Sequence, residues 1–341
     1  MSTQQTAAGY DITIGSVNFT HNDSKGLISV IVEDHVDMAS ICSVTVSTAE
    51  NQPTHTYEIG AKVVIKIKTP EDLFNGEVIA IDHAFQGKGT SSIILKCIDN
   101  SHRLGRGRLT RFWNDMKDSD IVQEVGSESQ LSVECDPTDE VHKYVLQRNE
   151  SNIAFLKRLA ARNNFQLRVE PGKLLFKKAS LNGQSREIST EAGLISMNMS
   201  YNSSEMVGEV VVRGWDIASK KEIVGKASAS DVQSIGGGKA GHELSSVFGE
   251  KTAYVTDVPV RTQQEADMLA LAEMERIARQ FCRGKCTIVG DDSVRAGTTV
   301  SFAKFGANVN GNFYVISSRH IIAPSSGYRT EIAFCSNTMG S

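Results

Sequence analysis

Two cysteines, Cys282 and Cys286, are four residues apart and could supply two thiolate ligands to a metal ion. A zinc site needs four ligands, yet no second pair of Cys or His residues at zinc-site spacing accompanies them in the sequence. We therefore interpret both as buried thiols at the end of a helix. The remaining four cysteines are scattered through apolar segments, which is typical of free thiols in a protein made in a reducing compartment. They are Cys42, Cys97, Cys135 and Cys335.

An acidic run, Glu33-Asp34-His35 followed by Asp37, could bind a cation or take part in acid/base chemistry. No second cluster pairs with it, so we interpret the run as a solvated turn after a strand. The segment Gly236-Gly237-Gly238-Lys239 could cradle a phosphate. A phosphate loop, however, follows a strand and leads into a helix that begins with Ser or Thr, so we predict a flexible loop instead.

Two histidines, His83 and His320, fall at similar places in two strand-rich segments. Catalysis would require a nucleophile or a carboxylate in a shared cleft, and the sequence assigns neither, so we interpret them as hydrogen-bonded strand histidines. The sequence thus predicts no catalytic residue, no cofactor-binding residue and no metal ligand. We expect a protein that is not an enzyme and carries no cofactor.

A basic stretch with neighbouring aromatic residues could bind nucleic acid. Its residues are Arg103, Arg106, Arg108, Arg111, Phe112 and Trp113. The whole chain is acidic, with 40 Asp and Glu against 36 Lys and Arg and a net charge of -4, which argues against a broad nucleic-acid or membrane surface. We predict a protein interface or a solvated linker here, without nucleic-acid specificity.

The stretch of residues 144–178 predicts a strand, a helix and a hairpin in succession. Ser151 or Asn152 can cap the helix, which continues to about Asn163. Its apolar side chains recur every three or four residues and form one stripe, as in a helix that lies on a sheet. These side chains are Ile153, Phe155, Leu156, Leu159 and Ala160. Pro171-Gly172 then has the residue pair of a tight turn between two alternating strands.

Segments of alternating apolar residues flank this stretch on both sides. We predict an α+β, mainly β protein with a first β-barrel domain over residues 1–100, a middle α/β domain over 101–190 and a second β-barrel domain over 191–341. A short helix is expected at residues 119–125. Within the last domain, residues 215–255 are polar and glycine-rich and predict an extended mobile loop. Residues 262–281 predict a helix, because Thr262 and Glu265 form a capping box before a run of strong helix formers.

The two β-rich halves resemble each other in the order and spacing of a few residues. Gly60, Val63, Asn75-Gly76, His83 and Cys97 of the first half are echoed by Gly297, Val300, Asn310-Gly311, His320 and Cys335. We interpret this echo as a duplicated barrel, with the two Asn-Gly pairs at equivalent hairpin turns. Three such chains around an axis would present six similar units on a three-fold body.

Three stretches resemble the late control gene D and VgrG-like family of baseplate hub proteins, found in contractile phage tails and contractile injection systems. The first stretch resembles the family's Gln-x-x-Glu-Ser-x-x-x-Phe-x-x-Arg-Leu signature at Gln147, Glu150, Ser151, Phe155, Arg158 and Leu159. The second resembles its Val-x-Gly-Trp-Asp element at Val212, Gly214, Trp215 and Asp216. The third resembles the closing hairpins at Gly297, Asn310-Gly311, Tyr314-Val315, His320 and Gly327-Tyr328-Arg329-Thr330.

The resemblance implies a structural homotrimer that adapts a six-fold inner tube ring to a three-fold spike. Its partners would be the tube ring protein and a spike protein, with baseplate wedge and tape-measure proteins as further candidates. The protein would be made in the bacterial cytoplasm and assembled into a virion baseplate or an injection particle. A tail-associated cell-wall-degrading enzyme and a peripheral receptor-binding module are the alternatives.

Two expectations concern the ends of the chain and its membrane contacts. The first residues lack the charged start and apolar run of a signal peptide, and no apolar segment approaches the roughly 20 residues that span a bilayer. The last predicted strand, residues 328–335, is followed by six small or polar residues, which we expect to form an exposed tail. A separate spike chain below the hub would follow, unless the sequence is a fragment of a longer chain.

Overall fold

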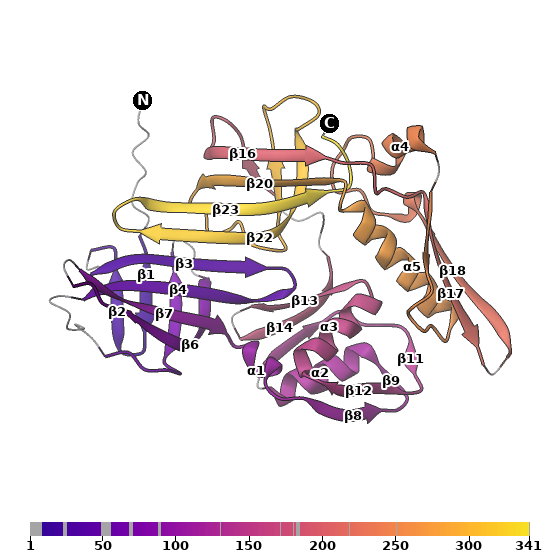
Figure 1. The fold of residues 1–341 in the computed structure, drawn as a ribbon, viewed down its shortest axis with the longest axis horizontal. Coiled ribbons are helices and arrows are strands. Elements are labelled where there is room, and N and C mark those ends of the chain that lie inside the picture. The colour runs from indigo at the N-terminus through magenta and orange to yellow at the C-terminus, as the bar shows by residue number, and fades with distance from the viewer. Residues whose placement is uncertain are drawn as a thin grey trace.

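The protein is described by a computed structural model, whose ribbon is shown in Figure 1. Strands dominate it, so the prediction of a mainly β protein with a few helices is confirmed. No helix among the described residues is both long and apolar enough to cross a membrane. The described residues are 9–22, 26–48, 56–67, 71–87, 90–129, 131–170, 172–179, 181, 185–217, 219–249 and 251–340.

Within the described residues, one curled sheet of 13 strands contains both β-rich halves of the chain. The first half contributes β1 (Asp11–Ile14), β2 (Val17–Thr20), β3 (Leu27–His35), β4 (Met38–Thr48), β5 (Lys62–Lys66), β6 (Asp72–Ala84) and β7 (Ser91–Asp99). The second contributes β15 (Arg186–Ile188), β16 (Leu194–Tyr201), β20 (Cys282–Val289), β21 (Thr299–Phe302), β22 (Gly311–Ala323) and β23 (Gly327–Ser336). The two halves are joined edge to edge, because β22 pairs with β3.

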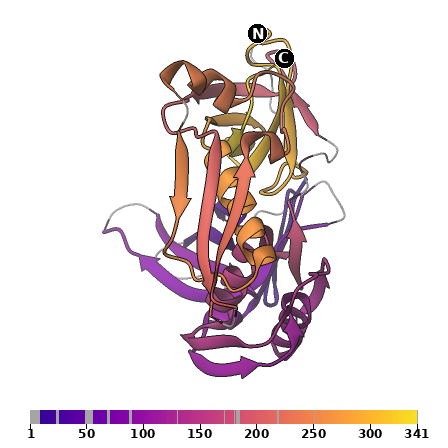
Figure 2. The ribbon, with the colours of Figure 1, turned by 90° about the vertical axis from the view of Figure 1, so that its right-hand side faces the viewer.

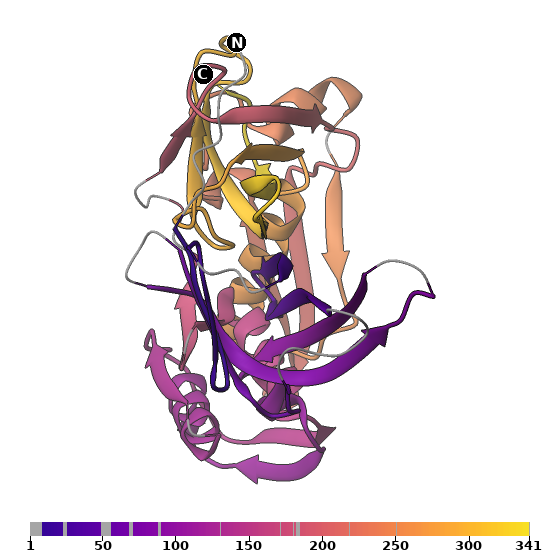
Figure 3. The same ribbon diagram turned by 90° about the vertical axis from the view of Figure 1, so that its left-hand side faces the viewer.

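The strands of the sheet follow the order β16-β20-β23-β22-β3-β4-β7-β6-β5-β1-β2, and β21 pairs with β22 and β15 beside this path. Figure 3 shows the indigo and purple strands of the first half between the yellow strands of the second half and the magenta middle unit. Each half has its own apolar core, because alternate side chains of its strands point to one face. In β7, for example, Ile93, Leu95 and Cys97 are buried.

The two halves repeat one pattern of strand pairing at a constant spacing in the sequence. In the first half Val63 of β5 pairs with Gly76 of β6, and in the second half Val300 of β21 pairs with Phe313 of β22. Val300 lies 237 positions after Val63, and Phe313 lies 237 positions after Gly76. The same spacing relates the pairing of β6 with β7 to that of β22 with β23. Because cross-strand register fixes which side chains share a face, equivalent side chains of the two three-strand units point to equivalent faces of their strands.

The irregularities of the two units repeat as well. The register shifts between Val78 and Ala80 in β6, and it shifts between Val315 and Ser317 in β22, again 237 positions later. The neighbouring pairs β3–β4 and β16–β20 also share a shift, which falls after Leu27 in the first half and after Leu194 in the second. Bulges change strand twist locally, so their repetition extends the likeness to five strands of each half.

The predicted hairpin turn at Asn75-Gly76 is wrong, and the two Asn-Gly pairs are not at equivalent turns. Asn75 and Gly76 lie inside β6, where the strand is held on both sides by β5 and β7. A side chain at Gly76 would come within 2.2 Å of the Ile98 carbonyl oxygen, so this glycine is required by close backbone approach and not by a turn. Asn310 immediately precedes β22, and Gly311 is the first residue of that strand. By strand register, the residue that corresponds to Asn75 is Asn312.

Other members of the sequence echo have the correct register. Gly60 and Gly297 are 237 positions apart and have left-handed φ angles of 87° and 83°, which a residue without a side chain adopts readily. His83 and His320 have the same spacing. Cys335 is one residue out of step, because the structural counterpart of Cys97 is Phe334.

The middle of the chain forms a compact unit of helices and short strands. Its elements are α1 (His102–Gly105), β8 (Leu109–Trp113), β9 (Met116–Lys117), α2 (Asp118–Glu128), β10 (Ser132–Cys135), β11 (Val141–His142), β12 (Val145–Glu150), α3 (Asn152–Arg162), β13 (Phe165–Glu170) and β14 (Lys173–Lys178). The predicted cap of α3 is confirmed, since Ser151 accepts a hydrogen bond from the Ala154 backbone amide. Four side chains of the predicted stripe are buried and Ile153 is partly buried: Phe155, Leu156, Leu159 and Ala160 are the buried four.

The expectation of an extended loop over residues 215–255 is wrong. This part of the chain belongs to β17 (Glu209–Asp216), β18 (Lys221–Ser228), η1 (Ala229–Asp231), α4 (Gly241–Ser245), η2 (Ser246–Phe248) and β19 (Thr252–Val255). The small and apolar residues Ile223, Gly225 and Ala227 alternate along β18 and pack against α5 (Gln263–Ala278), where an added side chain at Gly225 would meet the Ala266 backbone. Figure 2 shows this three-strand sheet in front of α5.

Residues 337–340, which follow β23, are not an exposed tail. Asn337 and Thr338 are buried, and the Asn337 side chain accepts a hydrogen bond from the Ile235 amide and donates one to the Gln233 carbonyl. Thr338 also forms an isolated antiparallel β-bridge with Ala240. Small polar residues with free side-chain donors and acceptors can satisfy buried backbone groups, which is why this segment packs despite its polarity.

Candidate functional site

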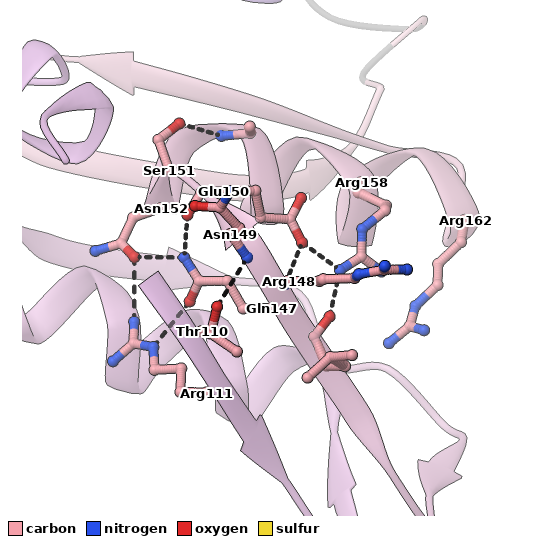
Figure 4. A network of polar contacts seen from close by, with 12 residues as sticks. Thr110, Arg111, Gln147, Arg148, Asn149, Glu150, Ser151, Asn152, Arg158 and Arg162 are labelled. Carbon is pink, nitrogen blue, oxygen red and sulfur yellow. Dashed lines mark hydrogen bonds and ion pairs between the residues drawn. The ribbon is translucent and has the colours of Figure 1, made fainter. Parts of the chain in front are cut away.

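Gln147 is the first residue of the family-like signature in residues 147–159, and it is the centre of a polar network. It is completely buried in β12 (Figure 4). Its Nε2 donates to the Glu150 carbonyl and to Asn152 Oδ1, both at 3.0 Å, and its Oε1 accepts from Arg111 Nε at 2.8 Å. A buried amide whose donors and acceptor are used in this way fixes the junction between β12 and α3 to strand β8.

Glu150 and Arg158 of the signature form a second clamp over the same junction (Figure 4). Arg158 Nη2 donates to Glu150 Oε1 and to the Leu146 carbonyl, each at 2.7 Å. Asn149 adopts a left-handed φ of 46°, and its amide donates to Thr110 Oγ1 at 3.1 Å. The polar residues of the signature therefore hold the chain where it turns from strand to helix.

The aromatic residues beneath the network complete this packing. Trp113 stacks on Phe155 at 5.0 Å with an angle of 6° between the rings. The Arg111 guanidinium lies 4.8 Å from the Trp113 ring and forms an ion pair with Glu128 at 2.7 Å. The charge of the Arg111 guanidinium is thus balanced within the fold, because the group makes both a cation–π contact and an ion pair.

Two other arginines of the basic stretch have internal partners as well. Arg103 is paired with Glu77, and Arg108 donates to the Asn149 carbonyl at 3.2 Å. Phe112 and Tyr144 stack on each other at 5.7 Å and remain exposed. Arg103, Arg108 and Arg111 of the basic stretch therefore all have partners within the fold.

The second family element, Val212 to Asp216, lies on β17. Val212 is buried in the core between the small sheet and α5. Gly214 is required there, because an added side chain would come within 2.9 Å of the Val260 carbonyl oxygen. Trp215 points to the opposite face of the strand and is 57% exposed.

The sequence candidates for chemistry are dispersed in the structure. Cys282 and Cys286 are buried on β20, a strand, and not at a helix end as expected. Burial raises the pKa of each thiol to about 12, which keeps both protonated. An inert protonated thiol fits their interpretation as packing residues.

The acidic run is a solvated turn only at Asp37, which is exposed in the turn after β3. Glu33, Asp34 and His35 lie inside β3, and Asp34 is buried. Asp34 Oδ2 accepts from Arg295 Nη2 at 2.6 Å, an ion pair between β3 and the connection from β20 to β21. These two residues line a cleft of about 650 Å³ beside Arg168 and Glu170, which pair with each other.

The glycine run 236–238 is packed and does not form a phosphate loop. An added side chain at Gly236 would lie 2.4 Å from Thr338 Oγ1, and one at Gly238 would lie 2.2 Å from the Gly340 carbonyl oxygen. The run is therefore glycine-rich because it passes close to the end of the chain.

A buried charge cluster that the sequence did not indicate lies between the middle unit and α5. Asp118 is completely buried at the start of α2. Its Oδ2 accepts from Arg162 Nε and from Asn163 Nδ2, both at 2.6 Å, and lies 3.5 Å from His142 Nε2. Burial alone would raise the pKa of the Asp118 carboxyl, but hydrogen bonds from His142 and Arg162 outweigh it and lower that pKa below its ordinary value.

His142 connects Asp118 to Glu265, and Glu140 lies near both. Its Nδ1 lies 3.2 Å from Glu265 Oε1, and the hydrogen bonds with Asp118 and Glu265 raise the pKa of His142 to about 9. Glu265 Oε2 accepts from the Arg261 amide at 2.7 Å. Glu140 Oε1 accepts from the Thr262 hydroxyl at 2.7 Å.

The sequence separation explains why this cluster was missed. Glu140 and His142 are on the middle unit, while Glu265 begins α5 more than 120 residues later. Glu265 was identified only as part of a capping box. The two segments come together through the tertiary packing of α5, for which a single sequence contains no local signal.

The architecture is that of known phage tail proteins. It is similar to the 43 kDa tail protein of prophage MuSo2 from Shewanella oneidensis (TM-score 0.75, 12% identity, 96% of this chain and 98% of that chain covered). It is also similar to the tail protein from Neisseria meningitidis MC58 (TM-score 0.74, 10% identity, 97% of each chain covered). A third similar structure is the E. coli c3393 protein, with TM-score 0.64 and 9% identity, covering 97% of this chain and 78% of that chain.

The E. coli protein is a component of the type VI secretion system and has structural similarity to the T4 bacteriophage tail proteins gp27 and gp5. The resemblance read from the signature stretches is thereby confirmed as a likeness of fold. Residues 24–324 match the family model described as the Alg8 N-terminal domain, and the chain belongs to this family. No curated protein matches the sequence.

Proposed function

We propose that this protein is the structural hub of a contractile injection apparatus, where it adapts a six-fold inner tube to a three-fold spike. The observation that carries the proposal is the repeated register of the two β units, with pairs at Val63–Gly76 and Val300–Phe313. A chain that contains the same strand unit twice can present two similar surfaces to two similar partners.

Symmetry gives this repeat its use. Three chains around one axis would expose six similar β units on a body with three-fold symmetry. Each half would then correspond to one subunit of a six-subunit ring. The middle unit and the β17–β18–β19 sheet occur once per chain, so they would be repeated only three times around the axis. The division into domains at residues 100 and 190 belongs to this proposal.

The likeness to tail proteins and to a type VI component supports an architectural role. The polar side chains of the signature make hydrogen bonds within the fold, since Gln147, Glu150 and Arg158 all bond within the β12–α3 junction. A side chain whose donors and acceptors are already bonded within the fold is not available to bind a substrate. We therefore propose a role without catalysis, in a virion baseplate or an injection particle assembled from cytoplasmic protein.

Light scattering of the purified protein at micromolar concentration tests the oligomeric part of the proposal. We expect a species of three chains of 37.1 kDa each. A reconstruction of the assembled particle tests the position, which should be axial and directly below the first tube ring. A stable monomer at micromolar concentration, or a peripheral location in the particle, would contradict the hub assignment and favour a receptor-binding module.

A further inference from the structure

Three potential metal ligands converge between β11 and the start of α5. They are Glu140, His142 and Glu265, and one ligand atom of each lies within 4.8 Å of the other two. His142 Nδ1 and Glu265 Oε1 are 3.2 Å apart. Two ligands of a tetrahedral zinc ion are separated by about 3.4 Å when each bond is roughly 2.1 Å long, so this pair already has the spacing of a coordination edge.

Glu140 contributes an oxygen that the protein itself does not use. Its Oε2 is buried and has no hydrogen-bond partner among the described residues, while Oε1 accepts from the Thr262 hydroxyl. Burying an unpaired carboxylate oxygen costs free energy unless a proton or a cation compensates for it. The Glu140 carboxylate belongs to the same group as His142 and Glu265, where a cation would supply that compensation.

The far side of the imidazole is arranged as metal-binding histidines usually are. His142 Nε2 faces Asp118 Oδ2 at 3.5 Å, and Arg162 and Asn163 hold that carboxylate in place. A carboxylate that accepts from one ring nitrogen fixes the tautomer and leaves the other nitrogen to the metal. His142 Nδ1 is the nitrogen that faces the two glutamates.

We propose that Glu140 Oε2, His142 Nδ1 and Glu265 Oε1 bind one divalent transition-metal ion of the zinc type. One imidazole and two carboxylates form a nitrogen and oxygen ligand set that suits Zn²⁺ and its neighbours, whereas Mg²⁺ prefers oxygen ligands alone. The ion takes the place of the Nδ1 proton, which leaves to solvent. It ties the middle unit to α5, so it has a structural role that does not depend on the proposed hub function.

Isothermal titration of the chelator-treated full-length protein with ZnCl₂ tests the site. We expect one ion per chain, with MgCl₂ giving no comparable binding. Glu140→Gln keeps an acceptor for Thr262 but removes the charged ligand, so it should weaken zinc binding by roughly tenfold or more. His102→Ala is the matched control, because His102 and Glu77 form another histidine–carboxylate pair, 3.8 Å apart, outside the cluster.

X-ray absorption of the zinc-loaded unmutated protein provides a test that does not depend on the folding of a variant. Ligation by nitrogen and oxygen gives bonds of about 2.0–2.1 Å, whereas ligation by cysteine sulfur gives about 2.3 Å. We expect the shorter bonds only. Absence of stoichiometric binding, a sulfur shell, or equal affinity in Glu140→Gln would each overturn the proposal.

Discussion

His320 and His83 occupy equivalent positions in the two β units, 237 residues apart, but only His320 is buried. His320 pairs with Thr330 on β23 and with Val32 on β3, so its strand is covered on both edges. His83 pairs with Ile93 near the end of β6, where it is exposed and stacks on Phe85. The joining of the halves through β22 and β3 therefore gives two copies of one residue different environments.

The buried position of His320 makes stability depend on pH. Burial lowers the pKa of His320 to about 4, while the unfolded chain has the ordinary value of 6.5. As the pH falls below 6.5 the unfolded state takes up a proton first, so stability is lost between pH 6.5 and pH 4. Between pH 7 and pH 5 this residue should remove about 2 kcal/mol of unfolding free energy.

Urea denaturation of His320→Gln at both pH values measures this contribution. The variant should lose less stability than the parent protein between pH 7 and pH 5. His83→Gln is the control and should show the parent's pH dependence. Parallel pH profiles for His320→Gln and the parent would contradict the assignment.

Phe155→Ala should strongly destabilise the middle unit. Phe155 is completely buried and stacks on Trp113, so its removal leaves a cavity beneath α3. We expect a loss of about 3–5 kcal/mol in unfolding free energy, measured by chemical denaturation. Phe112→Ala on the neighbouring strand removes an exposed ring and should cost less than about 1 kcal/mol. Similar losses in both variants would mean that α3 does not cover the core.

Gln147→Leu tests whether the signature amide stabilises the strand–helix junction. The substitution keeps the volume but removes the acceptor of Arg111 Nε and one of the two donors to Asn152 Oδ1, which keeps Arg111 Nη2. Unsatisfied polar groups in a buried site should lower the unfolding free energy by about 1–3 kcal/mol. Gln123→Leu on the exposed side of α2 is the control, with an expected change within about 0.5 kcal/mol.

Local sequence rules predicted those parts of the fold that local chemistry determines. The caps at Ser151 and Thr262 and the buried stripe of α3 were correct, because capping and helical periodicity act over a few residues. The Asn75-Gly76 turn failed for the opposite reason. Its backbone conformation is set by two flanking strands, and strand pairing overrides a local turn preference.

Contacts between distant segments could not be predicted from the sequence. The Asp34–Arg295 ion pair joins residues from the two ends of the chain, and the His142–Glu265 contact depends on how α5 packs. The sequence echo identified the duplication through His83 and His320. It could not show that β22 would pair with β3, which makes one sheet of the two units.

Asn337→Ala should release the segment of residues 233–241 from the end of β23. The Asn337 side chain bonds the Ile235 amide at 2.9 Å and the Gln233 carbonyl at 2.8 Å, and alanine leaves both backbone groups without these partners. The bridge between Ala240 and Thr338 then lacks its support on one side. We expect faster tryptic cleavage after Lys239 in the variant, followed by mass spectrometry of the fragments. Asn198→Ala, an exposed position on β16, should be cleaved at the parent's rate. Equal cleavage of Asn337→Ala and the parent would show that the glycine run is held by its own backbone contacts, such as Gly238 to Met339, and not by Asn337.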